Sequence, residues 1–355
     1  MSTFDKLQSV QALKSHYEGE LSKTHLKSLL DDGARNEALR TECASASLII
    51  DCTHTKVDAK GIELLKAVAE ETKVFPQIQS MFKGEVINNT EKRCVLHTAL
   101  RRPKTDTLQV NGTDVVKDVH TVLDQIKAFS DKVRDGTITG FTGKNLKNIV
   151  AIGIGGSFLG PEFVFEALRH DATCKAASAA KGMNLKFLAN VDPIDFFRAT
   201  DGLDVEETLF MIVSKTFTTA ETMLNARTCR KHIIDYYKSA KPGSADGDVL
   251  GKHLCAVSTN LKATAEFGIK DENVFGFWEW VGGRYSVSSA VGVLPLSLYY
   301  GFDNVQQFLD GMHNIDKNFS TETDITKNIP VFLGMIGFYN SHACGHASRA
   351  ILPYC

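Results

Sequence analysis

The segment Leu209-Phe210-Met211-Ile212-Val213-Ser214-Lys215-Thr216-Phe217-Thr218-Thr219 is the most informative part of the sequence. Its first five residues are wholly apolar, which is typical of a strand buried on both faces of a sheet. Its last six residues place four hydroxyls and one ammonium directly before 221–227, a segment that favours a helix. Because the first amides of a helix have no backbone partner, this strand-to-helix loop predicts an anion site.

A phosphate monoester suits the predicted site, because free N–H groups, hydroxyl donors and the helix dipole all favour negative charge at one place. The alternative is an ordinary Ser or Thr N-cap, which uses only one or two hydroxyls. Four hydroxyls together with Lys215 within six residues favour the phosphate site over the plain cap.

Four further short apolar runs resemble the one at 209–213 and lie at 148–152, 185–189, 253–257 and 273–277. The gaps between these short apolar runs leave room for crossover helices, which is the pattern of a parallel sheet covered on both faces. In such α/β folds, ligands bind at the carboxyl ends of the strands. Small and hydroxyl residues directly follow four of the runs, so we expect the functional site at that edge.

Composition limits the class of protein. Hydrophobic residues make up 43% and charged residues 23% of the 355, which is ordinary for a soluble globular enzyme, and the length favours two domains. The net charge of -2 argues against nucleic acid or a membrane surface as a partner. The eight scattered cysteines form no CxxC pair and the N-terminus lacks an apolar signal core, so we expect free thiols and a cytoplasmic protein.

The pattern of residues 1–115 predicts mostly helices, with a few short strands such as one at 47–52. Asp58 is the expected N-cap of one helix, and 115–133 is a long amphipathic helix. The apolar run at 94–100 fits either a strand or a buried helix.

A second loop, Ile154-Gly155-Gly156-Ser157, follows the run at 148–152. Phe158 takes the place of the third glycine of a dinucleotide fingerprint, and no Gly-Lys-Ser/Thr closes the turn, so neither a Rossmann site nor a P-loop is predicted. The remaining exposed amides and one serine suit a small anion or a sugar hydroxyl, and a purely structural tight turn fits equally well. Pro161 predicts the first turn of a helix over 162–169.

A third segment, Gly282-Gly283-Arg284-Tyr285-Ser286, combines two glycines with an arginine. The glycines let the backbone approach a ligand closely, and the guanidinium offers five fixed donors with a permanent charge. Such an arginine orients a sugar oxygen or stabilises negative charge that develops in a reaction. The alternative is a surface salt bridge, but the glycines and the position after the last strand favour a functional role.

Together the three segments resemble the motifs of the glucose-6-phosphate isomerase (phosphoglucose isomerase) family, in the same order and at similar spacing. The segments Trp278-Glu279-Trp280, Phe302-Asp303-Asn304, Val95-Leu96-His97 and Ala99-Leu100-Arg101 are similar to the family as well. The resemblance covers essentially the whole chain.

The resemblance implies an α/β fold: a sugar-isomerase (SIS) three-layer domain with a five-stranded parallel sheet, plus part of a second SIS domain. On this basis 1–115 is an N-terminal helical segment that packs on the large domain, 116–295 is the small sugar-isomerase domain, and 296–355 begins the large one. The implied activity is an aldose–ketose isomerase that interconverts D-glucose 6-phosphate and D-fructose 6-phosphate in glycolysis and gluconeogenesis. The family uses no cofactor, and we expect no metal and a homodimer at full length.

The resemblance also implies a set of substrate-binding residues: Gly156, Ser157, Ser214, Lys215, Thr216, Phe217, Thr218, Thr219 and Gly283. Ser157 and the Ser214–Thr219 loop, with Lys215 acting through its backbone, are expected to hold the phosphate. Arg284 is the implied catalytic residue, which stabilises the enediolate between C1 and C2 of the sugar.

Some positions depart from the family. Phe158 stands where many relatives have aspartate, and Ala220 where many have glutamine. The segment 351–355 resembles the stretch just before the family's glutamate motif, so the base glutamate, the ring-opening histidine and the C-terminal lysine are expected beyond this sequence. We therefore expect a C-terminally truncated chain that is inactive on its own.

Two alternatives stay open. One is a non-catalytic SIS module that binds sugar phosphates, as in regulators, although the long N-terminal segment and the arginine favour the enzyme and no DNA-binding helical motif is visible. The other is a zinc site at His342 and His346, which have helical spacing with Cys344 between them. A third zinc ligand is not evident, so ordinary packing of these histidines is favoured.

Overall fold

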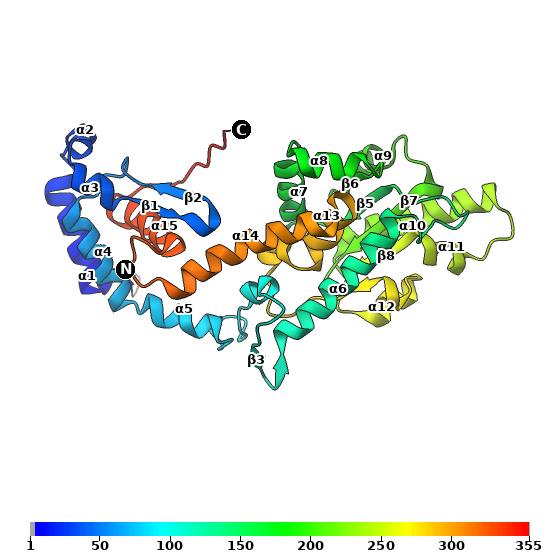
Figure 1. Ribbon diagram of the computed structural model, residues 1–355, viewed down its shortest axis with the longest axis horizontal. Helices are drawn as coiled ribbons and strands as arrows, with labels where there is room; N and C mark the ends of the chain where they lie inside the picture. The colour runs from blue at the N-terminus through cyan, green and yellow to red at the C-terminus, as the bar shows by residue number, and fades with distance from the viewer. Residues whose placement is uncertain (1–3, 355) are drawn as a thin grey trace. The chain divides into compact units, whose positions relative to one another are not determined.

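The computed structural model describes residues 4–354, which form two compact units (Figure 1). One unit joins 4–87 with 311–354, and the other comprises 88–310. The domain boundaries expected after residues 115 and 295 stay a prediction.

The strands are β1 Arg40–Cys43, β2 Leu48–Asp51, β3 Gln109–Val110, β4 Thr113–Asp114, β5 Asn148–Ile152, β6 Asn184–Leu188, β7 Thr208–Val213, β8 Leu254–Val257 and β9 Val274–Phe275. The α-helices are α1 Gln8–His16, α2 Leu26–Leu30, α3 Gly33–Ala38, α4 Ala59–Glu71, α5 Val74–Phe82, α6 Val115–Arg134, α7 Gly156–Leu168, α8 Ala172–Ala179, α9 Pro193–Thr200, α10 Ala220–Ala240, α11 Asp246–His253, α12 Leu261–Phe267, α13 Ala290–Tyr300, α14 Phe302–Thr321 and α15 Ile329–Phe338. Short 3₁₀ segments are η1 Phe4–Lys6, η3 Ala44–Ala46, η4 His97–Arg101, η5 Val205–Glu207, η6 Asp271–Asn273 and η7 Gly283–Ser288, and π-helical turns are η2 Tyr17–Leu21 and η8 Tyr339–Ala343.

The unit 88–310 is built on a five-stranded sheet in the order β6-β5-β7-β8-β9, in which every neighbouring pair is parallel. Ile152 lies opposite Ile212, and Val213 lies opposite Val257, so the central strands end at nearly the same level. Helices α7 to α12 occupy the connections between the strands. The five strands predicted from the apolar runs are therefore confirmed, with ends shifted by one or two residues.

Alternate residues of the strands belong to two separate cores. Ile149 and Met211 pack with buried residues of α6 and α13, whereas Val150 and Phe210 pack with buried residues of α10 and α11. Because successive side chains of a strand point to opposite faces, each core covers one face of the sheet. The predicted three-layer α/β fold is thus confirmed (Figure 1).

Two local predictions were wrong. The helix expected over 162–169 begins at Gly156 instead, because Gly155 adopts a φ of 57° and Leu159 N–H already donates to the Gly155 carbonyl at 2.8 Å. The run 94–100 contains neither a strand nor an α-helix, but a 3₁₀ turn over His97–Arg101. Leu96 and Leu100 are still fully buried, which explains the apolar pattern.

The other unit pairs β1 with β2 in an antiparallel hairpin and surrounds it with helices. Asp58 caps α4 as predicted, since its carboxylate accepts a hydrogen bond of 2.7 Å from Gly61 N–H. Buried Arg35 donates to the carbonyls of Thr53 and Val57, which ties α3 to the segment between the hairpin and α4.

Candidate functional site

The Ser214–Thr219 loop joins the end of β7 to the start of α10. Ser214 is buried, and its hydroxyl donates to Thr219 Oγ1 at 3.2 Å, which links the first residue of the loop to the last. Thr216 and Thr218 are exposed, with their hydroxyl oxygens 2.6 Å apart. Thr219 takes the N-cap position, but its side chain accepts no hydrogen bond from the described first turn of α10. The first amides of this long helix therefore lack a side-chain acceptor, contrary to a plain N-cap.

Phe217 fixes the shape of this loop. Its φ of 58° is left-handed, which is unfavourable for a bulky residue and requires support from the surroundings. The side chain is buried and packs edge-on against Phe267 with ring centroids 5.5 Å apart. Its N–H donates to the Ser214 carbonyl at 3.2 Å. Phe217 thus anchors the loop in the core, and its contact with a substrate stays a prediction.

The exit from β8 orients the loop's peptide groups. The Lys215 carbonyl accepts hydrogen bonds from Ser258 Oγ at 3.1 Å and from Thr259 N–H at 3.0 Å, and Asn260 Nδ2 donates to the Thr216 carbonyl at 3.1 Å. In a trans peptide, the N–H points opposite to the carbonyl. The N–H of Thr216 is therefore directed away from β8, where it is available to an anion.

The Lys215 side chain connects this loop to the segment before the arginine. Its Nζ donates to the Glu279 carbonyl at 3.2 Å, lies 3.6 Å from the Glu279 carboxylate and sits 5.8 Å from the centroid of the Phe277 ring. The ammonium is therefore engaged, which is consistent with a role for Lys215 through its backbone.

The glycine loop turns directly into α7. Gly155 is the N-cap, and Ser157 lies half-buried in the first turn, where its N–H donates to the Ile154 carbonyl at 3.1 Å. A Cβ added to Gly156 would stand 2.1 Å from the Gly283 carbonyl oxygen and 3.0 Å from Arg284 N. Only glycine fits this position, so the contact brings the glycine loop against the arginine turn η7.

The arginine turn is held from inside and leaves Arg284 exposed. Ser286 is buried, and its hydroxyl lies 2.7 Å from the Gly283 carbonyl and 3.3 Å from the Gly156 carbonyl, which closes the turn onto α7. The Arg284 guanidinium carbon lies 5.1 Å from the centroid of the Tyr285 ring. A side-chain hydrogen bond to Tyr285 raises the pKa of Arg284 above its usual value.

The structure thus brings the three predicted segments to one edge of the sheet. β5 and β7 are neighbours, so the glycine loop and the Ser214–Thr219 loop leave the sheet side by side. The Gly156–Gly283 contact and the Lys215–Glu279 bond then join both loops to the segment that carries Arg284. The edge combines backbone amides and hydroxyls at helix starts with one guanidinium, a chemistry suited to a phosphorylated sugar.

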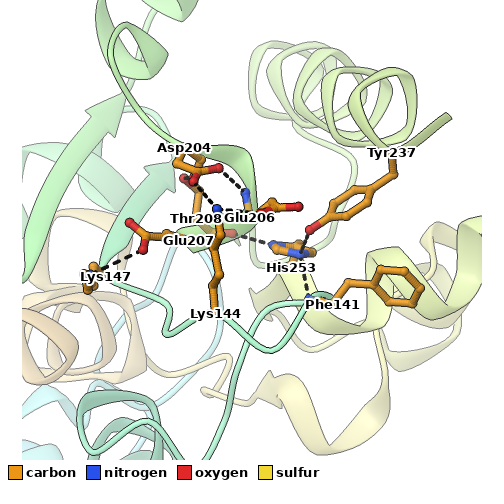
Figure 2. A network of polar contacts seen from close by, with 9 residues as sticks. All are labelled: Phe141, Lys144, Lys147, Asp204, Glu206, Glu207, Thr208, Tyr237 and His253. Carbon is orange, nitrogen blue, oxygen red and sulfur yellow. Dashed lines mark hydrogen bonds and ion pairs between the residues drawn. The ribbon is translucent and has the colours of Figure 1, made fainter. Parts of the chain in front are cut away.

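A second polar cluster lies at the opposite edge of the sheet, where β7 and β8 begin (Figure 2). Buried His253 donates through Nδ1 to the Thr208 carbonyl at 2.8 Å, while its Nε2 accepts from Phe141 N–H at 3.1 Å and Tyr237 O–H at 2.9 Å. Burial lowers the pKa of His253. Lys144 pairs with two nearby carboxylates, those of Asp204 and Glu206. Every partner of the imidazole belongs to the fold, so this cluster serves the structure.

The histidine pair considered for zinc does not share a helix. His342 lies in η8, which ends at Ala343, and stacks on Phe338 with ring centroids 4.4 Å apart. Across the described residues, no group of three or more His, Cys, Asp or Glu side chains is arranged to hold a metal ion. Within the same range, none of the helices has the length and apolar character needed to cross a membrane.

Comparison with known proteins places the chain in a family. The sequence pattern of the phosphoglucose isomerase family matches residues 51–355. Cytosolic glucose-6-phosphate isomerase A of Oryza sativa subsp. japonica is 49% identical over 344 residues, and the cytosolic glucose-6-phosphate isomerase of Arabidopsis thaliana is 49% identical over 342 residues. These matches cover 97% and 96% of this chain, but only 58% and 59% of the two relatives. The chain therefore spans less than two thirds of the length of the curated relatives it matches.

A solved structure supports the fold. The crystal structure of a glucose-6-phosphate isomerase from Chlamydia trachomatis aligns with a TM-score of 0.78, at 24% identity, over 97% of this chain and 61% of that one. At 24% sequence identity, this similarity supports a shared fold and nothing further. The match of residues 51–355 to the family pattern, together with 49% identity to the plant enzymes, shows that this chain belongs to the phosphoglucose isomerase family.

Proposed function

We propose that this chain binds D-glucose 6-phosphate and D-fructose 6-phosphate and takes part in their interconversion. The observation that carries the proposal is the convergence of the glycine loop, the Ser214–Thr219 loop and the arginine turn at one edge of the sheet. The relatives that share half of its residues are named glucose-6-phosphate isomerases, which favours an isomerase over a non-catalytic binding module.

In the proposed complex, the phosphate rests at the start of α10. The hydroxyls of Ser214, Thr216, Thr218 and Thr219, the outward amides of the loop, and Ser157 from α7 supply its hydrogen bonds. A hydrogen bond to a charged group contributes about 1.5–3 kcal/mol, so three or four of them anchor a small substrate. Phe217 holds the loop in shape, and Lys215 contributes its backbone.

The reactive end of the sugar then lies toward Gly156, Gly283 and Arg284. Isomerisation removes the proton from C2 of the aldose and returns a proton to C1, and the intermediate carries negative charge on its enediolate oxygens. The exposed guanidinium of Arg284 stabilises that charge, and the two glycines allow close approach. None of the ten proposed site residues is a carboxylate or a histidine, so the proposal assigns them binding and charge stabilisation rather than proton abstraction.

Calorimetry on the purified 355-residue chain tests the binding part of the proposal. Glucose 6-phosphate should bind, whereas unphosphorylated glucose should bind at least about a hundredfold more weakly, because the phosphate supplies the charge-assisted bonds. Equal affinity for the two sugars would contradict a phosphate site at the Ser214–Thr219 loop.

A chimera tests the activity. The present chain would replace the matching part of the rice enzyme, while the unmatched remainder of that enzyme is kept. A folded chimera should interconvert the two hexose phosphates, and the same chimera with Arg284→Ala should be slower by about 100–1,000-fold. A folded chimera without activity would contradict the isomerase role.

The family relationship supports two coarser proposals. We infer a cytoplasmic location, because the rice and Arabidopsis relatives are named cytosolic, and we infer a homodimer for the full-length protein. Nucleic acid is not among the proposed partners, given the net charge of -2. Sedimentation of the chimera and fractionation of cells that express it test the dimer and the location.

A further inference from the structure

The position of Arg284 depends on its neighbour in the sequence. Among residues 4–354, no carboxylate forms an ion pair with Arg284, and its side chain is exposed. The contact that restrains the guanidinium is with Tyr285, since the guanidinium carbon lies over the Tyr285 ring, 5.1 Å from its centroid. An arginine that stacks on an aromatic ring samples fewer orientations than a free one.

Tyr285 in turn contacts two further groups. Its ring stacks on His97, with centroids 5.2 Å apart and an interplanar angle of 27°. An edge of the ring also lies close to Gly282, where an added Cβ would stand 3.3 Å from Tyr285 Cδ2. The ring is 47% exposed, yet these contacts keep it from swinging into solvent.

His97 belongs to an element anchored against the same turn. Leu96 N–H donates to the Trp280 carbonyl at 3.4 Å, and the guanidinium of Arg101 donates to Ser288 Oγ at 3.4 Å. Leu96 and Leu100 are buried in the core that covers one face of the sheet. These contacts fix the position of η4, and with it the position of His97 against the Tyr285 ring.

We propose that His97 and Tyr285 are positioning residues, which hold the Arg284 guanidinium where the sugar's negative charge develops. The inference rests on the proposed function, since it assigns Arg284 that charge as its target. A stack of His97, Tyr285 and Arg284 orients the charge before the ligand arrives, so less side-chain freedom is lost on binding. A merely structural stack would instead affect the fold and all ligands alike.

Two ligands separate these possibilities. The first is 5-phospho-D-arabinonate, a sugar acid whose carboxylate mimics the charge of the enediolate. The second is D-glucitol 6-phosphate, a polyol with the same phosphate and no charge at the other end. Tyr285→Leu and His97→Leu should each lower the affinity for the sugar acid by about tenfold, and the affinity for the polyol by less than about twofold. Calorimetry on the 355-residue chain measures both affinities.

Conservative variants provide the rescue. Tyr285→Phe and His97→Phe keep the stacked rings and should retain affinity for the sugar acid within about threefold of the original chain. Phe197→Leu removes an exposed aromatic ring on α9, outside the site, and should change neither affinity. Thermal unfolding of each variant checks that the fold is kept. We expect little change for the Tyr285 variants, because this side chain is half exposed.

The outcomes are distinct. The positioning role is supported if the leucine variants lose affinity for the sugar acid alone and the phenylalanine variants keep it. Equal losses of affinity for both ligands, or no loss of affinity, would overturn the positioning role while leaving the phosphate site in place. If the original chain binds neither ligand, the proposed function fails first, and the positioning role fails with it.

Discussion

Gly156 and Gly283 lie in backbone contact, so close that a Cβ on Gly156 would stand 2.1 Å from the Gly283 carbonyl oxygen. The two residues are more than a hundred positions apart in sequence, and one starts α7 while the other starts η7. Their contact is what converts a glycine loop and an arginine turn into one surface, because any larger side chain would force the two backbones apart.

Replacing Gly156 with alanine should therefore disturb both stability and binding. The new methyl group meets backbone rather than a flexible side chain, and such overpacking costs about 1–3 kcal/mol. Both tryptophans of the chain, Trp278 and Trp280, lie in the sheet-bearing unit, so their fluorescence reports on its unfolding in urea. The matched control is Gly247→Ala in α11, where a Cβ has open space and alanine should be neutral or stabilising by up to about 1 kcal/mol. Equal stability of Gly156→Ala and the original chain would show that the contact is loose.

Thr216→Val combined with Thr219→Val should weaken glucose 6-phosphate binding by about 10–100-fold, because two hydroxyl donors to a charged phosphate are lost. Thr228→Val, on the exposed side of α10, is the control and should leave the affinity unchanged. Calorimetry measures both. Unaltered binding in the double variant would remove the loop from the phosphate site.

Lys215→Met tests whether this lysine acts through its backbone. Its ammonium is already engaged with Glu279, and its carbonyl is held by Ser258 and Thr259, so the peptide should keep its orientation without the charge. We expect less than about a fivefold loss of glucose 6-phosphate affinity, well below the effect of the threonine pair. A larger loss, relieved by salt, would identify the ammonium as a direct phosphate contact.

His253 predicts a dependence of stability on pH. Burial lowers its pKa in the folded chain, whereas in the unfolded chain the value is the ordinary one of about 6.5. Below that pH the unfolded chain gains a proton that the folded chain resists, because Nε2 already accepts from Phe141 and Tyr237. Asp204 and Glu206 oppose the shift without reversing it. Stability should therefore fall as the pH drops below about 6.5, by up to about 1.4 kcal/mol per pH unit, until the folded-state pKa is reached.

Urea unfolding of the sheet-bearing unit between about pH 7.5 and about pH 5.5 measures this slope. His253→Gln should be less stable near neutral pH and should lose this histidine's contribution to the slope. Thr228→Val, which removes no titratable group from the exposed side of α10, serves as control and should keep the original slope. Identical slopes for the two variants would mean that His253 does not titrate as described.

Much of the sheet-bearing unit was predictable because its strands are buried on both faces. A short apolar run such as 209–213 favours a strand buried on both faces of a sheet, and the gaps between the runs leave room for crossover helices. The three candidate segments followed from the same logic, since residues after parallel strands meet at one edge. Their physical contacts, such as Gly156 with Gly283, depend on backbone conformations that the sequence pattern does not specify.

Other features left little signal in the sequence. The apolar pattern of 94–100 reports burial, but not the turn that brings His97 to Tyr285. Pro161 favours a helix start, yet the left-handed Gly155 begins the helix earlier. His253 begins a short apolar run, and the neighbouring sequence does not indicate that its hydrogen-bond partners are Phe141 and Tyr237. In each case the missing information is a long-range contact.

A crystal structure of this chain with glucose 6-phosphate bound is the most direct test of the proposed site. The phosphate should lie within about 3 Å of the hydroxyls and amides of Thr216–Thr219, with the other end of the sugar toward Gly156 and Arg284. A phosphate bound away from this loop, or a sugar that extends away from Arg284, would contradict the claim that the three segments form one hexose-phosphate site.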